Sequence, residues 1–131
     1  MTKTIVQSVK FHATPEELFE LYLDAKKHSA ATGAPVKISR KVGGAFHAFG
    51  GSISGRNLLI LRNKMIVQAW RSVHFKQSDP DSILVLCFSK AAGGGRVDLV
   101  HVNVPQQDHK GVTQGWLKHY WKPWKRYLAA Q

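Results

Sequence analysis

The sequence contains almost no cysteine and no long apolar run, and both absences limit what the protein can be. Its 131 residues include one cysteine, Cys87, so an internal disulfide is excluded. No apolar stretch is long enough to span a membrane, and the N-terminus lacks the apolar segment of a signal peptide. We therefore expect a single domain over residues 1–131 that is cytoplasmic and does not insert into a membrane.

The residue patterns of metal sites and of common catalytic centres are also missing. Seven histidines are scattered along the chain without an HExxH motif or a cysteine pair, so we predict no metal site. There is no nucleophile elbow. The glycines at 43–44 and 93–95 are not followed by Lys-Ser/Thr, as a phosphate-binding loop requires. We therefore assign no catalytic residue and no cofactor from the sequence.

Acidic residues are few, and half of them lie in one short segment. The chain has eight acids against 19 Lys and Arg, which gives a formal net charge of +11. Glu16, Glu17, Glu20 and Asp24 contribute −4 without an intervening base, so the rest of the chain carries +15. Such a charge favours an anionic partner, such as nucleic acid, an acidic protein surface or a lipid headgroup. The alternative is that the charge only keeps the protein soluble.

The most distinctive stretch is a predicted amphipathic helix over residues 115–128. At about 100° per residue, one face carries Trp116, Tyr120, Trp124 and Tyr127. This face is widened by Leu117, Leu128 and Trp121. The aromatic face must be covered by the β-rich middle of the chain, either as ordinary core or as the wall of a cavity. We expect Pro123 to kink the helix rather than end it, because the amphipathic pattern keeps its phase beyond the proline. The opposite face carries Lys118, Lys122, Lys125 and Arg126.

Ahead of this helix, the patterns predict two short helices and seven strands. Alternation over residues 4–11 indicates a first strand, and the segment Thr-Pro-Glu-Glu at 14–17 has the form of a capping box that begins a helix. A second helix should end at Gly33. We expect a bend at 50–51, a turn at 55–57 and a helix cap at Asp108. Strands are predicted over residues 36–39, 45–54, 58–61, 65–75, 82–89 and 96–104.

The resulting order of elements is β-α-α-β-β-β-β-β-β-α. Consecutive strands joined by short turns should pair antiparallel. The sequence therefore predicts an α+β fold in which a curved antiparallel sheet wraps around a long C-terminal helix.

Several short segments occur together in an order that is typical of one family. They are FHATP at 11–15, VGGAF at 42–46, GSISG at 51–55, IVQAWR at 66–71, LVHVNVP at 99–105, and GW at 115–116 with YW at 120–121. Because of these segments, which are spread over nearly the whole chain, the sequence resembles the C-terminal domain of activators of the heat-shock protein 90 ATPase and its small stand-alone relatives. The resemblance implies the helix-grip fold of the START and birch-pollen-allergen (SRPBCC) superfamily. In that family, activator activity belongs to longer chains with an additional N-terminal domain, for which we expect no room here.

From these observations we predict a binding module with an apolar cavity for a small hydrophobic or amphipathic ligand, with a link to a chaperone implied by the resemblance. The alternative is an enzyme of the polyketide cyclase, aromatase or hydrolase kind known on this fold. His101 alternates in phase with the core-facing positions of its strand, which also fits a core histidine. The cavity is predicted to be lined by Phe46, Gln68, Trp70, Leu99, His101, Trp116, Tyr120 and Trp124.

The bases on the last helix form the predicted surface for an anionic partner. An acidic protein segment, such as one of a chaperone, would suit Lys118, Lys122, Lys125 and Arg126. Nucleic acid is disfavoured, because a stacking platform needs aromatic and basic side chains on one accessible surface and here they lie on opposite faces.

Overall fold

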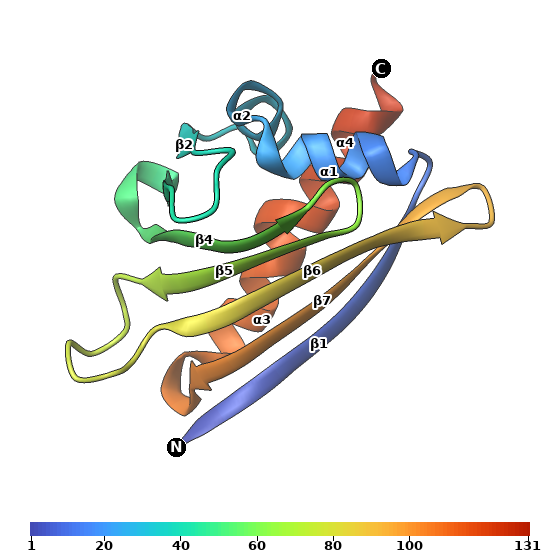
Figure 1. Cartoon of the computed structure of the whole chain (residues 1–131). Helices are drawn as coiled ribbons and strands as arrows, with labels where there is room; N and C mark the ends of the chain where they lie inside the picture. Colours follow the sequence, from blue (N-terminus) through green and yellow to red (C-terminus); the bar gives the residue numbers. More distant parts are fainter.

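Seven antiparallel strands form one curved sheet, and the helices lie against one of its faces in the computed structural model of residues 1–131 (Figure 1). The strand order is β1-β7-β6-β5-β4-β3-β2, which confirms the predicted α+β fold. The strands are β1 (Thr2–Phe11), β2 (Val36–Ile38), β3 (Ala45–Ala48), β4 (Ile53–Leu61), β5 (Met65–Ser72), β6 (Ser82–Ala91) and β7 (Gly94–Pro105).

Two short helices, α1 (Pro15–Leu23) and α2 (Ala25–Thr32), connect β1 to β2. Thr14 Oγ1 accepts a hydrogen bond from the Glu17 backbone at 3.1 Å, and a Glu17 side-chain oxygen accepts one from the Thr14 backbone at 3.1 Å. Asp24 then ends α1 and caps α2 through the Lys27 backbone, and Gly33 ends α2 in the left-handed conformation. The predicted capping box and the predicted end of the second helix are therefore confirmed.

The bend predicted at 50–51 is the turn between β3 and β4, and only one of the two predicted changes of direction is present. The chain reverses at Phe49–Gly51, where three consecutive residues have positive φ, and the predicted turn at 55–57 is wrong because those residues lie inside β4. Gly55 has a different role. A Cβ there would lie 1.8 Å from the Ala69 carbonyl oxygen and 2.8 Å from the Phe46 ring, so glycine permits a close approach to β5.

The C-terminal helix begins directly after Asp108, where its cap was predicted, and changes its winding once. It comprises α3 (His109–Trp116), a π-helical turn (Leu117–Trp121) and α4 (Lys122–Ala129), which run on from one another behind the sheet (Figure 1). Asp108 precedes the helix but makes no capping hydrogen bond through its side chain. None of the helices combines the length and the apolar character needed to cross a membrane.

The predicted continuation of the helix past Pro123 is confirmed, but the helix also contains a π-helical turn that was not predicted. Pro123 has no backbone N–H, and the π-helical turn lies immediately before it. Tyr120 and Trp121 are both buried as predicted, whereas Tyr127 and Leu128 are only half-buried. The placement of Leu117 on the buried face is wrong, because this side chain is 47% exposed. The buried face is therefore made of Trp116, Tyr120, Trp121 and Trp124.

A single apolar core fills the space between the sheet and the helices. Trp121 and Trp124 meet Phe11 of β1 at ring-centroid distances of 6.1 and 5.7 Å, and Trp124 lies 6.5 Å from Tyr22 of α1. The last helix is thus held both by the sheet and by the first helix, which agrees with the predicted grip of the sheet around it.

We expect Gly55→Ala to lower the free energy of unfolding by about 2–3 kcal/mol, because the new methyl group has no space against the backbone of β5. Gly111→Ala in α3 is the matched control. A Cβ there would meet nothing within 4 Å, so this change should stabilise the protein by about 0.5–1 kcal/mol through helix propensity. Urea unfolding of both variants measures the difference, and equal stability of the two would contradict the role assigned to Gly55.

Candidate functional site

A cleft of about 430 Å³ opens between the C-terminal helix and the strongly bent end of the sheet. This volume lies within the range of roughly 300–1,000 Å³ that is typical of small-molecule sites. Its deepest part is formed by Trp70 of β5 together with Trp116 and Tyr120 of the helix, all of them at least 94% buried. Other apolar residues of the wall are Phe49, Ile53 and Val112, and polar residues that line it are Ser52, Ser72, His74, Gln107, Asp108 and His119.

Two glycines on α3 keep this cleft open. Gly111 and Gly115 both line it and are four residues apart, which places them on one face of the helix, one turn above the other. A Cβ at Gly111 would meet nothing within 4 Å, and one at Gly115 would meet only the His119 ring at 3.8 Å. The sequence signal that was missed is a pair of glycines at helical spacing, in a helix that intrinsic propensity would otherwise fill with larger residues.

The structure brings three of the eight predicted cavity residues together at this cleft: Trp70, Trp116 and Tyr120. The other five are buried in the core and do not line the cleft: Phe46, Gln68, Leu99, His101 and Trp124. We retain the first three as candidate ligand contacts. The predicted set also lacked Phe49 and His119, whose rings lie 5.4 Å apart on the wall of the cleft.

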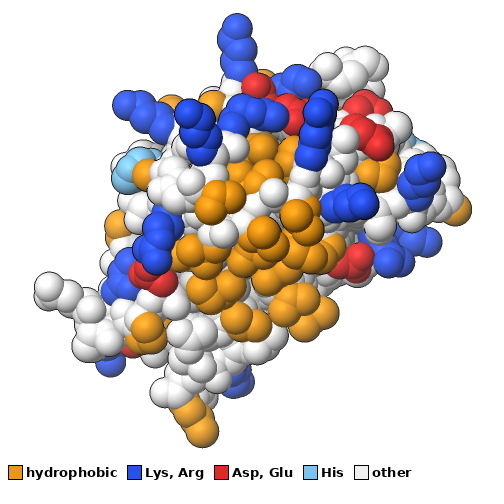
Figure 2. All heavy atoms as spheres, viewed as in Figure 1, with side chains coloured by type: hydrophobic (Ala, Val, Ile, Leu, Met, Phe, Trp, Pro, Cys, Tyr) orange, Lys and Arg blue, Asp and Glu red, His pale blue; other side chains and the backbone are white.

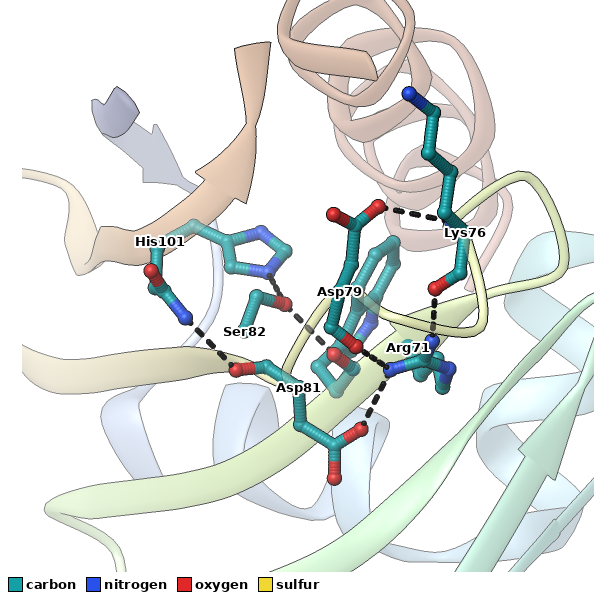
Figure 3. A network of polar contacts seen from close by, with 8 residues as sticks. Arg71, Lys76, Asp79, Asp81, Ser82 and His101 are labelled. Atoms are coloured by element: carbon teal, nitrogen blue, oxygen red, sulfur yellow. Dashed lines mark hydrogen bonds and ion pairs between the residues drawn. The ribbon is translucent and has the colours of Figure 1, made fainter. Parts of the chain in front are cut away.

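His101 belongs to a hydrogen-bonded chain behind two residues of the cleft wall, Trp70 and Trp116. Figure 3 shows its bond to Ser82. The Trp116 indole N–H donates to His101 Nδ1 at 3.1 Å, and an indole can only donate, so Nδ1 accepts and Nε2 carries the proton. Nε2 then donates to Ser82 Oγ at 2.8 Å, and that hydroxyl donates to the Trp70 carbonyl at 2.7 Å. Burial lowers the pKa of His101 to about 3, which keeps the ring neutral.

This arrangement does not activate Ser82 as a nucleophile. A general base must accept the hydroxyl proton, but the nitrogen of His101 that faces Ser82 already carries one. Neither side chain has any exposed surface. The chain of bonds instead fixes the orientation of the Trp116 ring, and with it one wall of the cleft.

A second buried network holds Tyr120, the other aromatic wall on the helix. Its hydroxyl donates to His28 Nε2 at 2.9 Å, while His28 Nδ1 donates to the Tyr22 carbonyl at 2.7 Å. Burial lowers the pKa of His28 to about 4 and raises the pKa of Tyr120 above its usual value, so both are neutral near pH 7. The Tyr22 hydroxyl donates in turn to Gln68 Oε1 at 2.7 Å, and Gln68 donates to Asn57 Oδ1 at 2.9 Å.

Arg71 organises the loop that follows β5 near the mouth of the cleft (Figure 3). Its guanidinium donates to the Asp79 carbonyl at 2.7 Å and to the Asp81 carboxylate at 3.1 Å, and it lies 5.7 Å from the centre of the Phe75 ring. The Asp79 carboxylate closes the loop by accepting from the Lys76 backbone at 2.8 Å. Trp70 and Arg71 therefore lie on opposite faces of one strand. Trp70 forms part of the cleft wall, and Arg71 holds the loop.

The four bases predicted to meet an anionic partner form one exposed surface on the C-terminal helix. None of them takes part in the three ion pairs of the structure, which are Arg40–Glu20, Arg71–Asp81 and Arg96–Asp98. Their charges are therefore not neutralised within the chain. They are Lys118, Lys122, Lys125 and Arg126.

A family model described as Activator of Hsp90 ATPase homolog 1-like protein matches residues 12–129. The chain is similar to Activator of 90 kDa heat shock protein ATPase homolog 1 of Homo sapiens, with 27% identity over 112 residues, and to the corresponding homolog of Dictyostelium discoideum, with 23% identity over 118 residues. These alignments cover 86% and 90% of this chain but only 33% and 31% of the relatives, so the chain spans about a third of their length.

Solved structures share the fold. The crystal structure of an HSP90 activator from Plasmodium falciparum matches with a TM-score of 0.82 and 24% identity, over 98% of this chain and 96% of that chain. The likeness confirms the helix-grip architecture that the sequence resemblance implied.

The two buried histidines make stability depend on pH. An exposed histidine has a pKa of about 6.5, and burial in the folded chain lowers the pKa to about 4 for His28 and about 3 for His101. As the pH drops below about 6.5, these two histidines bind protons in the unfolded chain but stay neutral in the folded chain. The free energy of unfolding should therefore fall by up to about 1.4 kcal/mol per pH unit for each histidine.

His28→Gln should make this decline between pH 7 and pH 5 shallower, because one of the two groups with a lowered pKa is removed. Denaturant unfolding at several pH values measures the slope, and the exposed His47→Gln serves as the control. Equal slopes in the parent protein and in His28→Gln would contradict the assignment.

Proposed function

The chain belongs to the family described as Activator of Hsp90 ATPase homolog 1-like protein, and from this premise we propose that it is a binding module whose cleft takes a small apolar or amphipathic ligand. The observation that carries the proposal is the space above Gly111 and Gly115, which faces the rings of Trp70 and Trp116. A flat apolar group fits between these rings and the helix backbone. The hydroxyls, imidazoles and carboxylate along the wall suit a polar end group.

The state of the polar groups favours binding over the enzymatic alternative of a cyclase, aromatase or hydrolase. Functional acids and bases are expected to have shifted pKa values and to face the substrate. Here the histidines with lowered pKa values are fully hydrogen-bonded within the core, and their bonds orient Trp116 and Tyr120. We infer that these networks position the walls of a binding site.

The family name also supports a chaperone as a partner of this chain. Two curated relatives are named as activators of a 90 kDa heat shock protein ATPase, although the chain spans only about a third of their length. We propose that an acidic segment of a chaperone contacts the four bases of the C-terminal helix: Lys118, Lys122, Lys125 and Arg126. A cytoplasmic location fits this proposal.

Gly115→Leu should block the cleft. The leucine side chain would occupy the space beside Trp116, and the helix should gain stability because leucine has a higher helix propensity than glycine. We expect a naphthalene sulfonate dye to bind about tenfold more weakly than to the parent protein, with Gly115→Ala as a milder control. Native mass spectrometry of freshly purified protein should show a co-purified ligand that Gly115→Leu lacks. If a folded Gly115→Leu variant binds the dye as tightly as the parent protein does, the cleft is not the ligand-binding site.

Reversal of all four helix charges to glutamate should abolish binding of an acidic chaperone segment, because these bases are exposed and unpaired. Binding to the parent protein should weaken steeply as salt is raised, since the screening length is about 8 Å at physiological ionic strength. Fluorescence anisotropy across a salt series measures both effects. The same affinity and the same salt dependence in the reversed variant would eliminate this helix as the contact surface.

A further inference from the structure

The face of the sheet that points away from the helices carries an uninterrupted apolar row. Strand register places Val6 opposite Val100, Val100 opposite Val85, Val85 opposite Val67, and Val67 opposite Leu59. The row thus crosses five neighbouring strands, from β1 to β4, without a polar residue. On a sheet with one solvated face, polar residues are expected at these outward positions.

The rows on either side extend this apolar surface, which we call the outer face. One adjacent row contains Ala69, Ile83 and Val102, and the other contains Leu61, Met65 and Cys87. Leu59 and Leu61 are 40% and 45% exposed, and Val6 is 73% exposed. Figure 2 shows these side chains merging into one patch in the middle of the sheet, and Figure 1 shows every helix on the other side.

The border of the outer face is basic. Lys10 and Arg96 lie opposite one another at the end of the β1–β7 pair, and Arg56 lies opposite Ala69 beside the apolar rows. Two acids lie at this border and each is already bonded to a base: Asp98 to Arg96 at 2.9 Å, and Asp81 to Arg71 at 3.1 Å. In Figure 2, lysine and arginine side chains lie above the patch and at its sides, with a few acidic side chains among them. An apolar surface with a charged border marks an interaction site rather than ordinary solvated sheet.

We propose that the outer face docks an acidic amphipathic segment of a partner protein. Apolar side chains of the segment would lie along the valine row, and its carboxylates would meet Lys10 and Arg56, which take part in no ion pair of the structure. Electrostatic complementarity of this kind steers association and selects the partner. The site lies on the opposite side of the sheet from the cleft, so it does not depend on the ligand proposed there.

Charge and shape favour this occupant over two others. A second copy of the chain would bring like-charged borders together, each on a protein with a net charge of +11. A membrane surface is usually met by protruding Trp, Phe or Leu side chains. The central rows here are mostly short valines, and all four tryptophans are at least 95% buried. A flat surface of short branched side chains suits close contact with another protein.

The test uses three isosteric substitutions in the central row, Val67→Thr, Val85→Thr and Val100→Thr, combined in one variant. Threonine keeps the shape and the strand preference while it makes the surface polar. The matched control replaces two exposed loop valines, Val42→Thr and Val73→Thr. The probe is a fluorescein-labelled helical peptide with leucines on one face and glutamates on the other.

Fluorescence anisotropy should show that the peptide binds the parent protein and the control variant equally, and the triple variant about tenfold more weakly, which corresponds to about 1.4 kcal/mol. Binding should persist when the four bases of the C-terminal helix are reversed. A leucine–lysine peptide of the same length should not bind. Circular dichroism checks that the triple variant is folded.

Several results would overturn the proposal. They are a lack of peptide binding to the parent protein, equal binding to the triple variant, or loss of binding only in the helix variant. If the triple variant instead loses self-association in sedimentation velocity, the occupant is a second copy. If it loses binding to vesicles that contain phosphatidylserine while peptide binding is unchanged, the occupant is a membrane.

Discussion

The burial of four large rings on a single helix is the constraint to which the rest of the chain is fitted. Trp116, Tyr120, Trp121 and Trp124 are each at least 94% buried, and a buried ring of this size contributes roughly 4–6 kcal/mol by its apolar area. A flat sheet offers no surface that surrounds such a helix face. The sheet therefore bends, β4 contains a bulge after Asn57, and the first helix closes the remaining side.

The sequence predicted those parts of the fold that depend on local chemistry. The capping box at Thr14, the end of α2 at Gly33 and the antiparallel order of strands follow from neighbouring residues and short connections. The turn expected at Gly55 was wrong because glycine signals both a turn and a close approach between strands, and only the position of Phe46 and Ala69 distinguishes these. The π-helical turn was missed because the amphipathic pattern assumed 3.6 residues per turn throughout.

The candidate site was predictable only in part, for a related reason. Aromatic periodicity placed Trp116 and Tyr120 between helix and sheet, and the alternation of β5 placed Trp70 there. A ring lines a cleft rather than fills the core when the space next to it is empty. Here that space is left by two residues without side chains, Gly111 and Gly115. The hydrogen bond of His28 joins it to a residue 92 positions away, and that of His101 to a residue 15 positions away. No local sequence pattern predicts such bonds.

The close spacing of the tryptophans gives the protein a built-in optical property. Trp70 and Trp116 lie 6.2 Å apart, Trp116 stacks on Trp121 at 5.7 Å, and Trp121 meets Trp124 at 5.5 Å, measured between ring centroids. These are all the tryptophans in the chain, so its ultraviolet emission arises from one coupled group of chromophores. Excitation absorbed by any of the four indoles can migrate among them, so a change in the surroundings of the pair that borders the cleft, Trp70 and Trp116, affects the emission of the whole group.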